Sequence, residues 1–277
     1  MKRRNFLLAA TSGVAAMIGY SHWLEPFWLD VTQRDMPIRH LPQSLDGKTL
    51  LQLSDLHIGP LVDDTYLERV WRAGAALRPD IVTYTGDWVT WRGTSQLRQL
   101  EGHLTRVPRG RMATLSVLGN HDYGERWREL PVSNEIADRV QLAGITVLRN
   151  AATEVNGLMI VGIDDFWSPM ARPEKALAGW SRETPALVLN HNPDCMDHRA
   201  RWLGYDGWVL SGHTHGGQCR SPFLTPPILP VRNKRYTSGE IDVGDGRRVY
   251  ISRGVGFNIQ VRLNVRPEIT LFTLRRA

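Results

Sequence analysis

The sequence predicts an α/β protein with two mixed β-sheets and helices on the outside. Strand-like and helix-like segments alternate over the first half of the body, which is typical of βαβ units. Strand-like segments then follow one another toward the C-terminus, which favours antiparallel pairing. The chain has 277 residues, of which 42% are hydrophobic. This length is enough for one large core, so we expect a single domain over residues 46–277.

Apolar runs of strand length and runs with helical periodicity alternate from Lys48 onward. The predicted strands in this part are Lys48–Ser54, Ile81–Gly86 and Met112–Gly119. Helices are predicted at Asp63–Asp80 and Ser95–Leu104, and a helix-rich stretch broken at Pro131 at Glu125–Ala143.

The second half is predicted to contain more strands than helices. Asn156-Gly157 is a strong hairpin signal between strands near Ala152–Val155 and Leu158–Ile163. Buried strands at Ala186–Asn190 and Gly207–Ser211 flank a helical stretch. The last predicted strands are Tyr236–Val243, Arg247–Ser252 and Glu268–Leu274.

Residues 1–30 are predicted to be an export leader and not part of the domain. Lys2, Arg3 and Arg4 precede an apolar run that reaches about Tyr20, which is the layout of a signal peptide. The arginine pair followed by Asn-Phe-Leu resembles a twin-arginine signal, so the Tat export machinery is an expected partner. The expected location is therefore the periplasmic face of the inner membrane.

The sequence leaves open whether this leader is cleaved. It contains no Ala-x-Ala cleavage site, and Trp23, Phe27 and Trp28 follow the apolar run like an interfacial aromatic belt. Both a soluble product and a protein that stays attached to the membrane fit this pattern.

The charge is unevenly distributed along the chain. The net charge is +6, and residues 218–277 contain eleven Arg and Lys against four Asp and Glu. Such a half suits anionic partners, although a solvated basic face explains it equally well. The two cysteines, Cys195 and Cys219, cannot form a disulfide framework and belong to no Cys-x-x-Cys pair, so a cysteine zinc site is not expected.

Carboxylate, amide and imidazole side chains follow five of the predicted strands, and all of them except His121 and Asp122 are candidate metal ligands. These residues are Asp55, His57, Asp87, Asn120, His121, Asp122, His191, His213 and His215. Any one of them alone is more simply explained as a cap, turn or core residue. Because loops beyond the carboxyl ends of strands form the sites of α/β proteins, we expect the set to meet at one edge.

Carboxylate, amide and imidazole ligands without a thiolate suit two divalent metal ions such as Mn, Fe, Zn, Ni or Co. An aspartate shared by both ions would hold them about 3.5–4 Å apart, the geometry used for in-line displacement at phosphorus.

The ordered motifs Asp-x-His, Gly-Asp, Gly-Asn-His-Asp, His and Gly-His-x-His resemble the calcineurin-like metallophosphoesterase family, over roughly residues 50–274. The resemblance implies a four-layer αββα sandwich. The runs "GHTHGGQ" and "SRGVG" resemble a narrower branch of exported or membrane-associated bacterial phosphodiesterases. Some members of that branch hydrolyse the pyrophosphate of a UDP-diacylglucosamine lipid precursor.

The resemblance also implies a role for each site residue. One metal would be bound by Asp55, His57 and His215, the other by Asn120, His191 and His213, with Asp87 bridging both. A metal-bridging hydroxide would attack phosphorus. His121 would protonate the leaving oxygen or stabilise phosphoryl charge, and Asp122 would orient the His121 ring.

Candidate substrate contacts lie in loops that follow the predicted strands or the glycine turn. They are Trp88, Trp91, Trp167, Arg220 and Phe223. The tryptophans would stack on a nucleobase or contact an acyl chain, although packing within loops is the commoner role. The proline-rich run "SPFLTPPILP" could face a membrane or an acyl chain, or only cover a sheet edge.

The sequence favours a phosphodiesterase acting on a phosphoester or pyrophosphate bond, with a lipid-linked or nucleotide-linked substrate. A phosphomonoesterase acting on small molecules or phosphoproteins is the alternative, and a metal-stabilised binding scaffold without turnover is a third reading. No nucleic-acid-binding module appears in the sequence, so a nuclease ranks lower.

Overall fold

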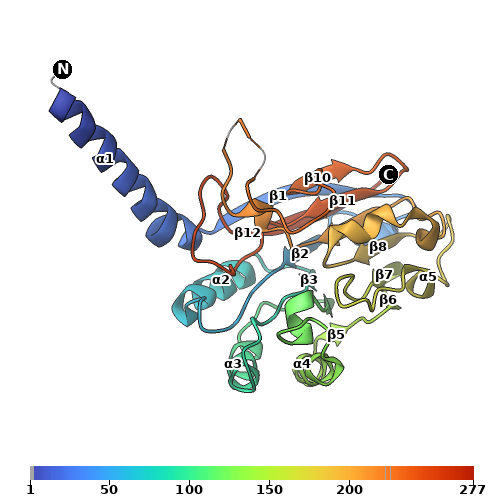
Figure 1. Cartoon of the computed structure of the whole chain (residues 1–277). Coiled ribbons are helices and arrows are strands. Elements are labelled where there is room, and N and C mark those ends of the chain that lie inside the picture. The colour runs from blue at the N-terminus through green and yellow to red at the C-terminus, as the bar shows by residue number, and fades with distance from the viewer. Residues whose placement is uncertain (1–2, 222, 225) are drawn as a thin grey trace.

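The computed structural model describes residues 3–221, 223–224 and 226–277, with side chains from residue 11 onward. Lys2 of the predicted leader lies outside the described residues. Two six-stranded sheets pack face to face, with helices on the outer faces (Figure 1). The predicted fold class is therefore confirmed.

The first sheet is mostly parallel and has the strand order β1-β12-β2-β3-β4-β5, with only the β12–β2 pair antiparallel. Its strands are β1 (Asp30–Ile38), β2 (Thr49–Leu53), β3 (Ile81–Thr85), β4 (Ala113–Val117), β5 (Thr146–Val147) and β12 (Glu268–Arg276). Three helices cover its outer face: α2 (Asp64–Ala76), α3 (Ser95–Leu104) and α4 (Leu130–Leu142).

The second sheet has the order β10-β11-β9-β8-β7-β6, with antiparallel pairs at both edges. Its strands are β6 (Ala151–Val155), β7 (Leu158–Gly162), β8 (Ala186–Leu189), β9 (Trp208–Ser211), β10 (Gly239–Asp242) and β11 (Arg248–Ile251). The short helix α5 (Pro173–Ala176) and the 3-10 helices η5 (Pro193–Asp197) and η6 (Arg199–Trp202) cover it. The predicted helical stretch between β8 and β9 thus consists only of 3-10 turns.

The core between the sheets explains why the central strands of each sheet are apolar on both faces. Leu50 and Ile81 of the first sheet pack with Leu187 and Leu210 of the second, and all four are fully buried. A second apolar layer lies under α2, α3 and α4, and a third lies outside the second sheet. Strands buried on both sides read as continuous apolar runs, which is why they could be found in the sequence.

Three local features differ from the sequence-based expectations. Pro131 does not break a helix but lies in the first turn of α4, where its missing N–H needs no partner. The short strand β5 was not predicted. Strand β1 was also missed, because its polar, half-exposed residues give no apolar run, yet it pairs with β12 over its whole length.

The segment predicted to be a leader continues directly into the folded part of the chain. Helix α1 (Arg3–Gly19) projects from the body in Figure 1 and is followed by the π-helical turn η1 (Tyr20–Leu24) and the 3-10 turn η2 (Glu25–Phe27). Among the described residues, no helix combines the length and the apolarity needed to cross a membrane. Ser21, Glu25 and Pro26 are buried, so residues inside the predicted 1–30 leader pack on the domain.

Candidate metal centre

The seven predicted ligands lie at the carboxyl ends of five strands that belong to both sheets. Asp55 and His57 follow β2, Asp87 follows β3 and Asn120 follows β4, while His191 follows β8 and His213 and His215 follow β9. All seven side chains are buried. Hydrogen bonds join the sheets at this edge; for example, Gln52 Nε2 donates to Ser211 O (2.9 Å), and the His213 N–H donates to Asp55 Oδ1 (2.9 Å).

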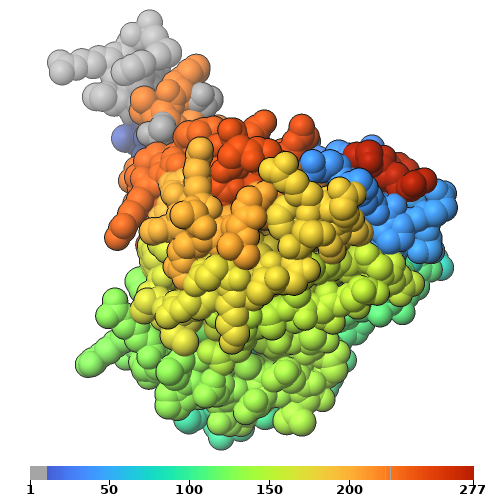
Figure 2. All heavy atoms as spheres, turned by 90° about the vertical axis from the view of Figure 1, so that its right-hand side faces the viewer, coloured from blue at the N-terminus to red at the C-terminus, as the bar shows by residue number. Residues whose placement is uncertain are grey.

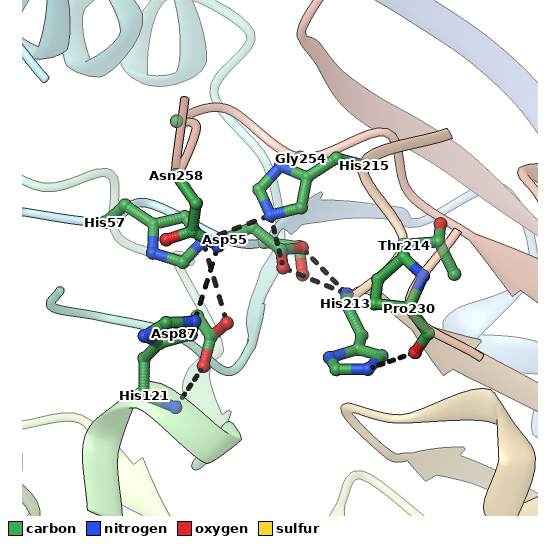
Figure 3. A network of polar contacts seen from close by, with 12 residues as sticks. Asp55, His57, Asp87, His121, His213, Thr214, His215, Pro230, Gly254 and Asn258 are labelled. Carbon is green, nitrogen blue, oxygen red and sulfur yellow. Dashed lines mark hydrogen bonds and ion pairs between the residues drawn. The ribbon is translucent and has the colours of Figure 1, made fainter. Parts of the chain in front are cut away.

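Their side chains form two clusters that meet at one carboxylate. Figure 3 shows Asp55, His57 and His215 of the first cluster, with Asp87 and His213 beside them. In the first cluster, His215 Nε2 lies 3.1 Å from His57 Nε2 and 3.4 Å from Asp55 Oδ1. In the second, His191 Nε2 lies 3.3 Å from His213 Nδ1 and 3.2 Å from Asn120 Oδ1.

Asp87 lies between the two clusters. Its Oδ2 is 3.6 Å from His57 Nε2 and 3.3 Å from His191 Nε2. Its Oδ1 accepts the backbone N–H of His121 (2.9 Å), which fixes the orientation of the carboxylate. One carboxylate oxygen therefore faces a histidine of each cluster, as a bridging ligand requires.

The hydrogen bonds of the second cluster leave its inward-facing nitrogens unprotonated when its histidines are neutral. His191 Nδ1 donates to Thr85 O and His213 Nε2 donates to Pro230 O, each over 2.8 Å, because a carbonyl oxygen can only accept. Lone pairs of His191 Nε2 and His213 Nδ1 then face each other and the oxygens of Asp87 and Asn120. Such a convergence of acceptors in a buried site needs a cation, so the donor set fits a divalent metal.

The pKa values agree with this donor set. Burial lowers the pKa of His57 to about 3 and that of His213 to about 3, so both rings are neutral, the form that binds metals. Burial acts to lower the pKa of His191, but the carboxylates of Asp87, Asp55 and Asp165 together outweigh burial and raise the pKa to about 10. Without a metal, a proton on His191 thus supplies the positive charge that Asp87 requires.

Five of the seven candidate ligands have a left-handed backbone, which side chains with a Cβ rarely adopt. Their φ values are 53° for Asp55, 50° for His57, 55° for Asp87, 73° for His213 and 49° for His215. Each such residue costs on the order of 1–3 kcal/mol and persists where the site needs it. The strain concentrates at the ends of β2, β3 and β9, where it turns the side chains toward the centre.

Two glycines of the motifs allow the backbone to come close to the carboxylates. A Cβ on Gly119 would overlap the Asp87 carboxylate, and a Cβ on Gly212 would overlap Ser54 and Asp55. Only glycine fits at these two positions, so steric limits explain why the motifs "LGNHD" and "LSGHTH" contain a glycine there.

His121 lies beside the clusters at the boundary of a cavity. Its ring packs edge-on against His57 at 5.0 Å and against Trp127 at 5.7 Å. Asn258 Nδ2 lies 3.3 Å from His121 Nε2. Burial lowers the pKa of His121 below its usual value.

Asp122 does not orient the His121 ring. One of its carboxylate oxygens accepts the N–H of Gly119 (2.9 Å) and the other accepts the N–H of Val89 (3.2 Å). Asp122 therefore ties together the loops that carry Asp87 and Asn120, and the ring is held by Asn258 and its aromatic neighbours. Burial raises the pKa of Asp122 to about 8.

A largely apolar cavity of about 320 Å³ opens beside the clusters. Its polar side is formed by Asp87, Asn120, His121, His213 and His215. Its apolar side includes Trp127, Trp167, Ile228, Ile259 and Val261. The Trp167 ring stacks on Trp127 at 5.0 Å and meets His213 edge-on at 4.4 Å.

Of the five predicted substrate contacts, only Trp167 lines this cavity. Trp88 is buried in the core, where its Nε1 donates to Ser116 Oγ (2.8 Å), so a substrate cannot reach its ring. Trp91 packs on the apolar layer under the helices. Arg220 and Phe223 are exposed and do not line the cavity.

Sequence reasoning missed Trp127, Asn258, Ile259 and Val261 in the cavity wall. Trp127 follows the Gly-Asn-His-Asp motif by only five residues, so proximity to that motif was an available signal. The other three lie some 40 residues after the last histidine motif, and no local pattern brings them to the site.

Comparison with known proteins places this geometry in a family. The family model described as calcineurin-like phosphoesterase matches residues 48–217. The phosphodiesterase YaeI of Escherichia coli (strain K12) is 32% identical, over 99% of this chain and 99% of that protein. The uncharacterized metallophosphoesterase YkuE of Bacillus subtilis (strain 168) is 30% identical, over 99% and 98%.

A more distant relative is the UDP-2,3-diacylglucosamine pyrophosphatase LpxG of Chlamydia trachomatis, which is 27% identical over 91% of each chain. The relatives thus include a phosphodiesterase and a pyrophosphatase, enzymes that cleave phosphoester or phosphoanhydride bonds. With the Asp/His clusters and the family match, the chain belongs to the calcineurin-like phosphoesterase family and is a phosphoester hydrolase.

Proposed function

We propose that the chain is a phosphodiesterase that uses two divalent metal ions. The observation that carries this proposal is the position of Asp87, whose Oδ2 faces a histidine of each cluster. One ion would be held by Asp55, His57 and His215, the other by Asn120, His191 and His213, and both by Asp87. When bound, the two ions would supply Lewis acidity toward the phosphoryl group and activate the attacking water.

The chain itself supplies orientation and exclusion of water. Thr85 O and Pro230 O fix the His191 and His213 rings, and the Thr90 hydroxyl lies 2.9 Å from His57 Nδ1. Such outer contacts set which ring nitrogen faces the metal. His121 lies at the cavity boundary, where it would hold a proton for the leaving oxygen or stabilise phosphoryl charge.

The cavity favours a phosphodiester with an apolar or aromatic group. Trp127, Trp167 and Ile259 form an apolar wall next to the clusters, and such a wall would bind an aryl ring or an acyl chain. The pyrophosphatase relative supports a lipid-linked pyrophosphate as one candidate substrate. The proposed metal ions are divalent Mn, Fe, Zn, Ni or Co, all of which suit the ligand set.

The leader supports action outside the cytoplasm. The twin-arginine-like pattern and the projecting helix α1 fit export and a location at the periplasmic face of the inner membrane.

A panel of phosphoesters tests the proposed function. We would measure hydrolysis of a bis-aryl phosphate, a mono-aryl phosphate and a lipid-linked pyrophosphate by the full chain with Mn²⁺, Zn²⁺ or Mg²⁺. The proposal predicts hydrolysis of the diester. Activity confined to the monoester would favour a phosphomonoesterase, and no turnover with any metal would favour a binding scaffold.

A further inference from the structure

Two segments far apart in the sequence expose large apolar side chains on the side of the molecule that carries α1. After α1, Trp23 is 65% exposed and Leu24 is 61% exposed. In the proline-rich loop after the histidine motif, Phe223 is 90% exposed and Leu224 is 71% exposed. We call these four residues the apolar rim. Figures 1 and 2 both show the loop projecting on the same side as α1.

The apolar rim is continuous with the mouth of the cavity. The loop that bears Phe223 and Leu224 also supplies Pro227 and Ile228 to the cavity wall. On the other side, Gln260 Nε2 donates to His22 O (3.1 Å), and the Arg262 N–H donates to Ser21 O (2.9 Å). The wall segment that contains Ile259 and Val261 is therefore bonded to the residues beside Trp23.

The surroundings of the apolar rim indicate a lipid bilayer as its partner. Helix α1 leads directly into Trp23, and its Val14, Met17 and Ile18 are also exposed. A projecting apolar helix and an apolar loop on one side suit a planar apolar phase better than a compact protein partner.

The charges near the apolar rim fit the same partner. Arg220 begins the loop and Arg266 stacks its guanidinium 3.6 Å from the centre of the Trp28 ring. Within the described part of the chain, neither guanidinium has a carboxylate in ion-pair contact. A guanidinium without a carboxylate partner beside the exposed Trp28, and a second one on the loop, suit the anionic headgroups of a membrane surface.

We propose that the apolar rim docks on a lipid bilayer and so places the mouth of the cavity at the lipid interface. Docking goes beyond the proposed hydrolysis and does not depend on it. Since Ile228 belongs to both the loop and the cavity wall, an amphiphilic phosphoester could pass from the bilayer to the metal clusters without crossing water.

Vesicle partitioning of the full chain tests docking without any substrate. We would measure the partition coefficient on phosphatidylglycerol/phosphatidylcholine vesicles by flotation for the unmodified chain, for Phe223→Ser/Leu224→Ser and for Trp23→Ser/Leu24→Ser. Each double variant should partition about tenfold or more weakly, because the serines remove large apolar side chains whose burial in the bilayer favours partitioning. The contributions of α1 and of the apolar rim to the free energy of partitioning add. The weaker partitioning of each double variant can therefore be measured even though α1 also contacts the vesicle.

A control is Leu142→Ser, which removes an even more exposed leucine (88%) at the end of α4, on the opposite side from α1. It should leave the partition coefficient unchanged. Unchanged partitioning of Phe223→Ser/Leu224→Ser, with thermal unfolding equal to that of the unmodified chain, would overturn the proposal. A second outcome would also overturn it: the unmodified chain forms a dimer without vesicles, and Phe223→Ser/Leu224→Ser dissociates this dimer but partitions normally. The loop would then bind a second copy of the chain. Because no turnover is measured, failure of the proposed hydrolysis would not affect the result.

Discussion

At the scale of single residues, Asp87 is the side chain on which both clusters depend. Asp87→Ala should remove a ligand from both ions and abolish turnover, because Oδ2 faces His57 and His191 together. Metal content measured by mass spectrometry after dialysis should fall from two ions per chain to less than one. Two retained ions in Asp87→Ala would contradict the bridging role.

His121 should separate metal binding from catalysis. Its ring lies beside Asp87 and His57 at the cavity boundary, a position that suits a proton donor. His121→Ala should keep both metals and lose about 10²–10⁴-fold in kcat. Asn258→Ala should have a smaller effect on kcat, since it only removes the contact that orients the ring. Full activity of His121→Ala would exclude a catalytic role.

Metal affinity should depend on pH through His191. In the metal-free protein, burial lowers the pKa of His191, but the carboxylates around it, Asp87 foremost, raise it to about 10, so the ring is protonated at neutral pH. A metal must displace that proton, and the apparent affinity should therefore rise about tenfold for each unit of pH between 6.5 and 8.5. Mn²⁺ titrations by calorimetry at three pH values check this slope. An affinity independent of pH would mean that His191 is already neutral before the metal binds.

At the scale of elements, the residues after α1 hold the cavity wall. Glu25 is fully buried and its Oε1 accepts the Val265 N–H (2.6 Å). The Arg262 guanidinium, also buried, donates to the carbonyls of Val265, Arg253 and Gly256. The turns η1 and η2 thus fix the segment that brings Asn258 to His121.

Glu25→Ala should destabilise the fold by about 1–3 kcal/mol, because it leaves the buried Val265 N–H without a partner. Denaturant unfolding measures the loss, and Glu183→Ala at an exposed position is the control, with no expected change. If both variants unfold alike, the leader junction is not part of the domain.

The elements also show how far the sequence could predict the fold. Strands β2, β3, β4, β8 and β9 were found because their residues are buried on both faces, and their polar ends gave the metal clusters. Strand β1 was missed because an edge strand needs no apolar run. Trp88 was misplaced because sequence proximity to Asp87 does not show which face of the loop a ring occupies.

At the scale of the whole molecule, the site exists only because the two sheets meet at one edge. The first sheet supplies Asp55, His57, Asp87 and Asn120, and the second supplies His191, His213 and His215. This contact between the sheets could be expected from the motif order. The cavity wall could not, since the 253–265 segment is held at the site by long-range hydrogen bonds to Ser21, His22 and Glu25.

The measurement that tests the account most directly is a titration of the metal-free full chain with Mn²⁺ during hydrolysis of a bis-aryl phosphate. A two-metal phosphodiesterase predicts that the rate rises until two equivalents per chain are bound and then stays constant. A rate that is complete at one equivalent, or no diester hydrolysis at any Mn²⁺ concentration, would contradict the account.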